Sequence, residues 1–374
     1  MSQKTIYING RSYGQRVTGV QRYGIETIAC LDQLIQQGEG SFARWVLLLP
    51  PGVPAPELKG IRVEHCGRFK GHLWEQLDLP WRARGGLIFS PGFTGPLWVK
   101  NQIVTVHDGA VVRFPQTYSR TFSWWYRSLV SRIVQRAPAT MAVSEFSAGE
   151  AVECFGAPAS KVHVATEGWQ HLERRSADER ILDRHQLRHR PFVLAVSSHT
   201  PNKNFAAVVR AIELMGDDGP LVAIAGAADI SIFSSTAAGS AGRTIQLGYV
   251  TDEELKALYS QATCFVMASF YEGFGIPPLE AMACGCPVIS STAAALQETC
   301  GAAALYFDPH DPAELARHIA RVVADPELRQ QLKAEGLKRT QHYSWERNAR
   351  LHLELLEATL ASNPRMQTAA PEGA

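Results

Sequence analysis

Short apolar segments recur along this chain and alternate with segments of helical periodicity. They cover residues 5–8, 45–49, 87–89, 103–106, 141–143 and 162–165 in the first half, and 192–197, 221–225, 244–247, 264–267 and 287–290 in the second. A strand that is buried on both faces is a continuous apolar run, and parallel strands need helical crossovers between them. The two series therefore predict an α/β protein with two doubly wound domains, each a parallel sheet covered by helices.

A polar segment separates the two series. Residues 171–190 are rich in charges, and Pro191 ends the segment. We expect domains at 1–170 and 192–343, with a linker at 171–191 and a ligand cleft between the domains. Because Ser344 is a good N-cap, a last helix is expected at about 345–361. The small polar residues 362–374 are expected to form a disordered tail.

The composition is that of an ordinary globular protein, with 45% hydrophobic and 20% charged residues. No run of 18 apolar residues occurs, and the first residues lack the apolar stretch of a signal peptide. Seven cysteines at irregular spacing favour a reducing compartment. Cys284 and Cys286 are expected to be small buried residues rather than metal ligands, because no histidine or cysteine pair stands at zinc spacing. We therefore expect a cytoplasmic protein with no metal and no other cofactor.

Charge is distributed unevenly along the chain. Residues 1–170 carry a net charge of +6 and the remainder −5, and residues 109–144 contain five arginines, several aromatic residues and no acidic residue. A basic helix with interleaved aromatic residues suits an anionic membrane surface or an anionic lipid. A basic exposed helix with a buried aromatic face explains the pattern equally well. Nucleic acid is not expected as a partner. The candidate membrane or acceptor contacts are Arg120, Trp124, Trp125 and Arg127.

Residues 269–290 carry the strongest indication of a binding site. Glu272 precedes Gly273-Phe274-Gly275-Ile276, and Glu280 follows in a predicted helix whose first turn holds two prolines. Glycines let a backbone approach a ligand, and the N–H groups at a helix start favour a diphosphate. Carboxylates accept hydrogen bonds from sugar hydroxyls. The segment thus indicates a nucleotide-sugar site, although a buried turn with two solvated glutamates would show the same local pattern.

Three further residues follow predicted strands, where open parallel sheets bind ligands. Gly19 lies after the first strand, His107 directly after an apolar run, and Lys203 before the first helix of the second series. An ammonium group at a helix start suits a phosphate, and the sequence contains no Asp-X-Asp that would indicate a metal-dependent sugar transferase. Structural alternatives are a tight turn at Gly19, a satisfied histidine at His107 and a solvated lysine at Lys203.

The order of these motifs resembles that of the retaining glycosyltransferases of family 4. The resemblance rests on Glu272 and Glu280 with seven residues between them, on the Thr-Gly-Val-Gln-Arg-Tyr segment at Gly19, and on Gly-Tyr-Val around Tyr249. It implies the GT-B fold. It also implies that Glu272 and His107 face the transferred sugar, that Glu280 binds the ribose, and that Tyr249 lies near the base. Gly19, Lys203 and the residues Gly273, Phe274, Gly275 and Ile276 are implied to contact the donor.

The implied reaction moves a hexosyl or deoxyhexosyl group from a nucleoside diphosphate sugar to a sugar hydroxyl with retention, and mannose from GDP-mannose is the first expectation. The expected acceptor is an oligosaccharide at the inner face of the cytoplasmic membrane, and a polyprenyl-diphosphate-linked chain of a surface polysaccharide is the candidate. The sequence departs from the family where many members carry an arginine before the lysine, because Ser197, Ser198 and His199 stand there. A sugar-nucleotide epimerase and a non-catalytic sugar- or lipid-binding scaffold remain as alternatives.

Overall fold

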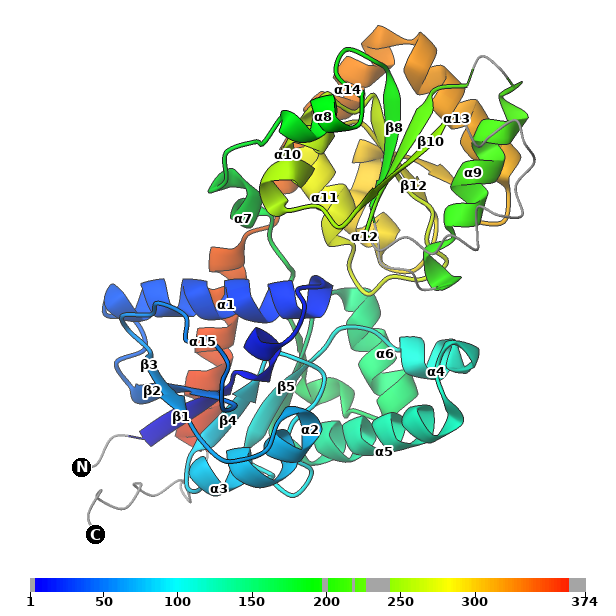
Figure 1. The fold of residues 1–374 in the computed structure, drawn as a ribbon. Helices are drawn as coiled ribbons and strands as arrows, with labels where there is room; N and C mark the ends of the chain where they lie inside the picture. Colours follow the sequence, from blue (N-terminus) through cyan, green and yellow to red (C-terminus); the bar gives the residue numbers. More distant parts are fainter. Residues whose placement is uncertain (1–3, 197–200, 217–218, 227–242, 363–374) are drawn as a thin grey trace. The chain divides into compact units, whose positions relative to one another are not determined.

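The computed structural model describes residues 4–196, 201–216, 219–226 and 243–362. These residues form two compact units (Figure 1). Unit 1 contains the described residues up to Glu167 together with those from Trp345 on, and unit 2 contains those of Gly168–Ser344. The expected tail at 363–374 and the residues Ser197, Ser198 and His199 lie outside the described residues.

Unit 1 is built on a seven-stranded parallel sheet with the strand order β3-β2-β1-β4-β5-β6-β7. The chain runs from β1 outward to β3 and then returns to place β4 on the other side of β1, with Ile6 beside Leu87. This reversal makes the gap between β1 and β4 the topological switch point of the unit. The strands are β1 (Lys4–Asn9), β2 (Ala43–Leu49), β3 (Arg62–His65), β4 (Leu87–Ser90), β5 (Gln102–Val106), β6 (Ala139–Ala142) and β7 (Val162–Val164).

Helices cover this sheet. They are η1 (Arg11–Gly14), α1 (Gly19–Gln36), α2 (Gly71–Leu73), η2 (Trp74–Asp78), α3 (Leu79–Arg82), α4 (Ala110–Arg113), η3 (Pro115–Thr117), α5 (Arg120–Arg136), α6 (Glu145–Phe155), η4 (Ala159–Lys161) and α15 (Trp345–Ser362). Ser144 caps α6, because its hydroxyl accepts a hydrogen bond from the Ser147 N–H at 2.9 Å. The helix α15 lies beside α1 (Figure 1), and Asn348 joins it to Thr27 of α1 at 2.8 Å and to the Ala165 carbonyl at 3.0 Å.

Unit 2 is built on a six-stranded parallel sheet with the order β10-β9-β8-β11-β12-β13. Its switch point lies between β8 and β11 by the same reasoning. The strands are β8 (Phe192–Val196), β9 (Leu221–Ala225), β10 (Thr244–Gly248), β11 (Cys264–Met267), β12 (Val288–Ser291) and β13 (Ala304–Phe307). The helices are α7 (Gln170–Glu173), α8 (Arg180–Arg184), η5 (Pro201–Lys203), α9 (Phe205–Leu214), α10 (Asp252–Gln261), α11 (Ile276–Ala283), α12 (Leu296–Cys300), η8 (Gly301–Ala303), α13 (Pro312–Ala324) and α14 (Pro326–Thr340).

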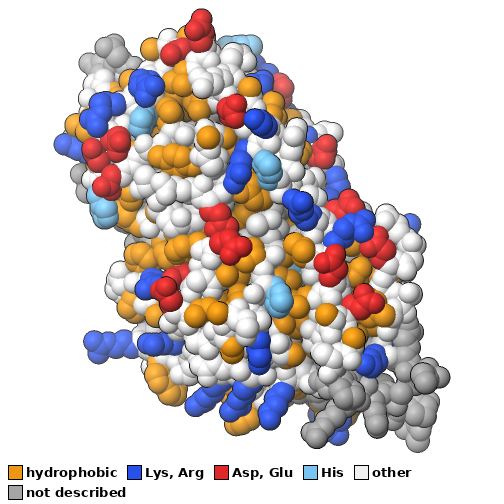
Figure 2. All heavy atoms as spheres, turned by 180° about the vertical axis from the view of Figure 1, so that it is seen from behind, with side chains coloured by type: hydrophobic (Ala, Val, Ile, Leu, Met, Phe, Trp, Pro, Cys, Tyr) orange, Lys and Arg blue, Asp and Glu red, His pale blue; other side chains and the backbone are white. Residues whose placement is uncertain are grey.

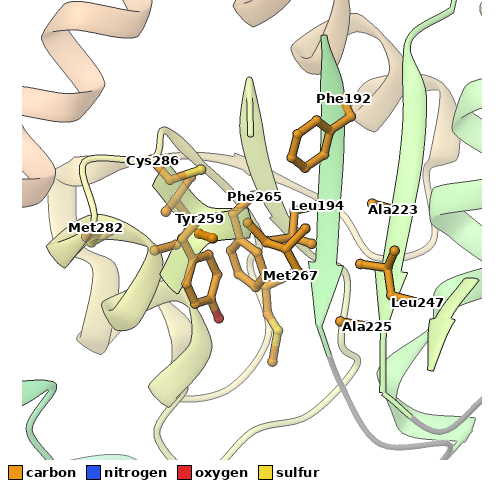
Figure 3. Packing of buried hydrophobic residues seen from close by; sticks show 14 of the residues in the cluster. Phe192, Leu194, Ala223, Ala225, Leu247, Tyr259, Phe265, Met267, Met282 and Cys286 are labelled. Atoms are coloured by element: carbon orange, nitrogen blue, oxygen red, sulfur yellow. The ribbon is translucent and has the colours of Figure 1, made fainter. Parts of the chain in front are cut away.

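The core of unit 2 lies on both faces of this sheet. On one face, Leu194, Phe265 and Met267 pack beside Tyr259 of α10 (Figure 3). Cys286 is buried in the same cluster, whereas Cys284 is only partly buried against it. Burial raises the pKa of the Cys284 thiol to about 12, so this thiol stays protonated at neutral pH.

The expected linker at 171–191 is wrong. These residues belong to unit 2, where α7 and α8 place Leu172, Ile181, Leu182 and Leu187 in its core. The apolar side chains are spaced by charged residues that face solvent, so the segment resembles a polar linker although its apolar face is buried.

Candidate functional site

In unit 2, two of the site residues predicted from the sequence lie together at the carboxyl ends of β8 and β11. Lys203 ends η5, which follows β8, and Glu272 follows β11. The Lys203 Nζ donates to Glu272 Oε1 at 2.7 Å, and the Ser269 hydroxyl donates to the same oxygen at 2.6 Å. Both charged side chains are mostly buried, with 17% and 12% of their surfaces exposed. Lys203, which was predicted to bind phosphate, and Glu272, which was predicted to bind the sugar, therefore form one ion pair at the switch point.

Local hydrogen bonds fix the loop that carries Lys203. The Asn204 side-chain amide donates to the Ala268 carbonyl at 3.1 Å and to the Pro309 carbonyl at 2.8 Å. Asn204 has a φ of 53° and precedes α9, in a left-handed conformation that asparagine adopts more readily than most residues. The Phe270 N–H also donates to the Asn202 carbonyl at 2.8 Å. These contacts tie η5 to the end of β11 and hold Lys203 beside Glu272.

The helix α11 begins at Ile276, directly after Gly275, as the prolines predicted. Gly275 has a φ of 103°, and a Cβ atom at this position would lie 2.7 Å from Leu296 Cδ2. Only glycine fits this turn without strain. The side chains of Phe274 and Ile276 are buried, so these two residues can meet a ligand only through their backbone N–H groups. Gly273 completes the turn between Glu272 and Phe274.

Glu280 lies inside α11 in a buried polar cluster. His171 Nε2 lies 2.7 Å from Glu280 Oε1, and the Tyr259 hydroxyl donates to Oε2 at 3.0 Å. Glu280 is 6% exposed and His171 2%. The pKa of Tyr259 is held well above its usual value, first by burial and then by the Glu280 charge, so its hydroxyl remains a donor. Sequence reasoning missed His171 and Tyr259, because His171 stood in the expected linker and Tyr259 is one aromatic residue of an amphipathic helix.

Tyr249 follows β10 and is 62% exposed. Its ring is accessible, as a residue that stacks on a nucleotide base must be. The adjoining Gly248 has a φ of 67°, and its carbonyl accepts the Gly226 N–H at 2.7 Å, so the ends of β9 and β10 are joined next to Tyr249.

In unit 1, His107 follows β5 and is 5% exposed. Its Nε2 lies 2.9 Å from the Pro91 carbonyl oxygen, which only an N–H can satisfy, so the proton of the neutral ring is assigned to Nε2. Nδ1 lies 3.9 Å from Glu167 Oε1. Burial lowers the pKa of His107 to about 4, and the ring is therefore neutral at pH 7. The ring packs edge-on against Tyr23 at a centroid distance of 4.8 Å.

Gly19 is the first residue of α1, and nothing lies within 4 Å of the position that its Cβ would take. Steric crowding therefore does not explain the glycine. The preceding Thr18 turns the chain into the helix, and its N–H donates to Gln21 Oε1 at 3.2 Å. The open space and the helix start are compatible with a ligand at this turn.

The basic aromatic segment forms α5. The buried face of α5 holds Leu129, Val130, Ile133 and Val134, while Trp124 is 73% exposed. Arg120 and Arg127 are also exposed, but Trp125 is half-buried and its ring lies 4.8 Å from that of His72. Figure 2 shows Lys and Arg side chains in a row along the lower edge of unit 1, with hydrophobic side chains beside them. Three of the four candidate contacts on α5 are thus accessible to a partner.

Within the described residues, no three His, Cys, Asp or Glu side chains gather in a way that could hold a metal ion. In the same part of the chain, no helix combines the length and the apolar character needed to cross a bilayer.

Known proteins resemble this chain in sequence. The family described as glycosyl transferases group 1 matches residues 178–339, which contain Lys203, Glu272 and Glu280. The O-antigen chain mannosyltransferase B of Escherichia coli is 31% identical over 267 residues, which cover 68% of this chain and 70% of that protein. The chain belongs to the glycosyl transferases group 1 family. It is therefore a glycosyltransferase, as the arrangement of motifs predicted.

Solved structures show that this group 1 glycosyltransferase has the GT-B-like architecture of two parallel-sheet domains. Sucrose-phosphate synthase from Thermosynechococcus elongatus superposes with a TM-score of 0.75 at 20% identity, over 96% of this chain and 100% of that one. Anabaena HepE in complex with UDP-glucose superposes with a TM-score of 0.67 at 17% identity, over 96% and 100% of the two chains. At these identities the likeness establishes the fold and nothing further.

Proposed function

We propose that this group 1 glycosyltransferase moves a hexosyl or deoxyhexosyl group, with mannose from GDP-mannose as the first candidate, from a nucleoside diphosphate sugar to a sugar hydroxyl with retention. The Escherichia coli relative is an O-antigen chain mannosyltransferase, which supports mannose as the sugar. The HepE complex supports a nucleotide sugar as the donor class. The observation that carries the proposal is the Lys203–Glu272 pair beside the start of α11.

In this proposal the donor diphosphate lies between Lys203 and the first N–H groups of α11. Departure of the nucleotide leaves negative charge on the diphosphate, and a fixed ammonium group and free N–H groups stabilise that charge without reorganising. Lys203 would move away from Glu272 and form an ion pair with the phosphate instead. Glu272 would then accept hydrogen bonds from hydroxyls of the transferred sugar, because its Oε2 has no hydrogen-bond partner among the described residues.

Glu280 would bind the ribose of the donor in this scheme. A carboxylate that already accepts from His171 and Tyr259 is fixed in one rotamer, so it would lose little entropy when it accepts from the ribose hydroxyls. In unit 1, the neutral His107 would offer its unprotonated Nδ1 to a sugar hydroxyl. No residue is assigned as a covalent nucleophile. The leaving phosphate would take the proton of the attacking hydroxyl.

We further propose that the acceptor oligosaccharide is linked to a polyprenyl diphosphate, in the synthesis of a surface polysaccharide, and that unit 1 binds the anionic membrane that holds it. The support is an apolar stripe, formed by Phe69, Leu73, Leu77 and Trp81. The last three residues lie on the continuous helical segment of α2, η2 and α3, at a spacing of four that puts them on one face. They are 61%, 53% and 74% exposed, which is unusual for such large apolar side chains.

Charge around the apolar stripe fits an anionic surface. The exposed charged residues between Cys66 and Lys100 are all basic, namely Arg68, Lys70, Arg84 and Lys100. The ring contact between His72 and Trp125 places α5, with its exposed arginines and Trp124, next to this segment. Apolar side chains flanked by basic ones are the pattern of a surface that lies in the headgroup region of a membrane.

The first experiment identifies the donor. GDP-, UDP-, dTDP- and ADP-sugars are added in the presence of EDTA, and the melting temperature and slow hydrolysis of each sugar nucleotide are measured. We expect one nucleotide, with GDP-mannose first, to raise the melting temperature and to be hydrolysed without metal. Stabilisation by none of them would refute the transferase mechanism. An epimerase would release an altered sugar nucleotide or sugar that needs no acceptor, and chromatography of the products separates that case.

A second experiment tests the membrane surface by flotation with vesicles of phosphatidylcholine, with and without phosphatidylglycerol. The triple variant Leu73→Gln, Leu77→Gln and Trp81→Gln should lose at least about tenfold in binding to anionic vesicles, because three apolar side chains leave the interface. The control variant Leu214→Gln with Leu337→Gln changes two exposed leucines of unit 2 and should bind as the wild type does. Equal binding of the triple variant would rule out this surface.

A further inference from the structure

Unit 1 contains a pocket that borders the Gly19 turn and has not yet been given a ligand, since Thr18 and Gln21 of that turn are among its lining residues. It has a volume of about 210 Å³ and is lined by Asn9, Arg11, Ser12, Gln15, Thr18, Val20, Gln21, Glu75, Gly92, Phe93, Thr94 and Tyr126. Asn9 ends β1, and Gly92 and Phe93 follow β4. The pocket therefore lies at the carboxyl ends of β1 and β4, which is the switch point of the unit 1 sheet. Open parallel sheets bind their ligands at such positions.

A buried polar network forms the floor of the pocket. Glu75 Oε1 accepts from the Asn9 amide at 2.9 Å and from Arg11 Nε at 3.0 Å, and His72 Nδ1 lies 3.1 Å from Glu75 Oε2. The Arg11 Nη2 donates to the Thr94 hydroxyl at 2.9 Å. The Glu75 side chain has no exposed surface, whereas 17% of the Arg11 side chain is exposed. Glu75 thus fixes the guanidinium, and the guanidinium reaches the pocket.

The backbone around Glu75 is unusual. Residues Trp74–Asp78 form a π-helical turn between α2 and α3. Single π turns occur inside helices often at functional sites, because they turn a side chain that a regular helix would direct elsewhere. The hydrogen bonds from His72 and Asn9 and the charge of Arg11 hold the pKa of Glu75 below its usual value despite its burial. The carboxylate is therefore charged at neutral pH, and it holds Arg11 in place.

The pocket offers hydrogen-bonding atoms that the protein itself does not use. Ser12 Oγ is buried and has no hydrogen-bond partner among the described residues, and Arg11 Nη1 makes no hydrogen bond to them. Phe93 and Tyr126 supply aromatic rings, which lie in edge-to-face contact at 5.7 Å. Polar groups and aromatic rings together bind a pyranose, since its hydroxyls form hydrogen bonds and its C–H face packs on a ring.

The charge of the pocket decides between a sugar and a phosphate. Arg11 is the only basic residue among those that line it, and the Glu75 carboxylate already neutralises the guanidinium. The remaining polar lining consists of hydroxyls and amides. A phosphate site would present an uncompensated positive charge, whereas a neutral polar ligand needs none.

We propose that this pocket binds one pyranose ring of the acceptor, with Arg11, Ser12 and the Phe93–Tyr126 rings as its ligands and with Glu75 and Asn9 as positioning residues. The assignment of this sugar to the acceptor rests on the proposed transferase function. The binding of a neutral pyranose by the pocket does not, and the two can fail separately.

The experiment uses methyl α-D-mannopyranoside as the probe and saturation-transfer NMR on the full chain. Gly92→Leu should abolish the signal, because Gly92 lines the pocket and a Cβ there meets only Val20 Cγ1, at 4.0 Å, so a larger side chain fills the space without a clash. The matched control is Gly149→Leu on α6, where Gly149 is exposed and nothing lies within 4 Å of its Cβ position. This control should bind the mannoside as the wild type does.

A second variant tests the polar floor. Arg11→Met should weaken binding of the mannoside roughly tenfold, as expected for one lost charge-assisted hydrogen bond, while Arg62→Met on β3 should not. No signal with wild type, an unchanged signal in Gly92→Leu, or displacement of the mannoside by inorganic diphosphate would each overturn the pyranose site. The melting-temperature shift with GDP-mannose is measured on the same proteins. Its absence refutes the proposed donor but leaves the pocket result standing, and its presence without mannoside binding refutes the pocket alone.

Discussion

Lys203 and Glu272 are paired at 2.7 Å, and both lie near residues that a donor would contact. A carboxylate that contacts the transferred sugar only as its anomeric carbon becomes positive stabilises the transition state more than the bound substrate. Glu272→Gln keeps the size of the side chain but removes this charge, so we expect turnover to fall by about 100-fold or more with the donor still bound. Initial rates of transfer measure this. The control Glu253→Gln changes a partly exposed glutamate of α10 and should keep full turnover. Full turnover in Glu272→Gln would disprove the role.

In the proposed scheme, His171 and Tyr259 would act through Glu280 rather than on the donor itself. Removing either hydrogen bond frees the carboxylate to adopt other rotamers, and His171→Leu or Tyr259→Phe should raise the KM for the donor roughly tenfold while kcat changes little. Because both act on one carboxylate, the double variant should lose less than the sum of the two. Steady-state kinetics with varied donor test this. A fall in kcat at unchanged KM would contradict the assignment of Glu280 to the ribose.

Sequence reasoning predicted those features of the candidate site that neighbouring residues encode. Gly275 and the prolines of α11 are recognised from neighbours within a few positions, and the structure confirms that the helix begins directly after Gly275. His171 meets Glu280 across 109 positions of the chain, and Asn9 meets Glu75 across 66. No local sequence pattern predicts that residues so far apart in the chain are in contact. Such contacts can be predicted only when the strand order of the sheet is known.

At the scale of elements, apolar runs predicted every central strand and missed two of the four edge strands, β3 and β13. The edge strand β3 has the sequence Arg-Val-Glu-His with only partial burial, so it lacks the apolar run of a central strand. The other missed strand, β13, follows a series of alanines that suits a helix equally well. The π turn of η2 was also not expected, because the apolar stripe and the buried Trp74 look like ordinary amphipathic periodicity.

The turn into α11 is the element whose geometry most depends on one residue. Gly275→Ala places a Cβ 2.7 Å from Leu296 Cδ2 and forces a non-glycine residue to a φ of 103°, so we expect a loss of roughly 1–3 kcal/mol in stability. Thermal unfolding of the purified protein measures this. The comparison variant Gly149→Ala lies in the exposed part of α6, where the same change should stabilise by about 0.5–1 kcal/mol. Equal melting temperatures for wild type and Gly275→Ala would show that the turn tolerates a side chain.

At the scale of the whole molecule, the chain returns to its first unit through α15. This helix adds polar contacts to unit 1: Lys4 Nζ donates to the Leu360 carbonyl at 2.5 Å in a partly buried contact, and the buried Tyr23 hydroxyl lies 3.0 Å from His352 Nε2. Unit 1 is therefore assembled from residues at both ends of the described chain. Its stability must depend on side chains of α15 as much as on the sheet.

The pH dependence of stability follows from this assembly. Burial lowers the pKa of both His107 and His352 to about 4, whereas an unfolded histidine titrates near 6.5. As the pH falls below about 6.5, the unfolded chain binds protons that the folded chain does not, so stability falls towards pH 4 and is fully present above pH 6.5. Each histidine contributes up to about 1.4 kcal/mol per pH unit in this window.

His352→Gln removes one of the two buried histidines. His352 is chosen because it is not placed in the donor or acceptor site. When the pH falls from 7 to 5, the free energy of unfolding of the variant should decrease by roughly 2 kcal/mol less than that of the wild type, because one histidine no longer titrates. Urea unfolding followed by tryptophan fluorescence at both pH values gives this difference. His163→Gln in β7 changes an exposed histidine and should keep the wild-type pH slope. If His352→Gln also kept that slope, the acid sensitivity of unit 1 would have to come from other groups, such as His107, and burial of His352 in α15 would have no part in it.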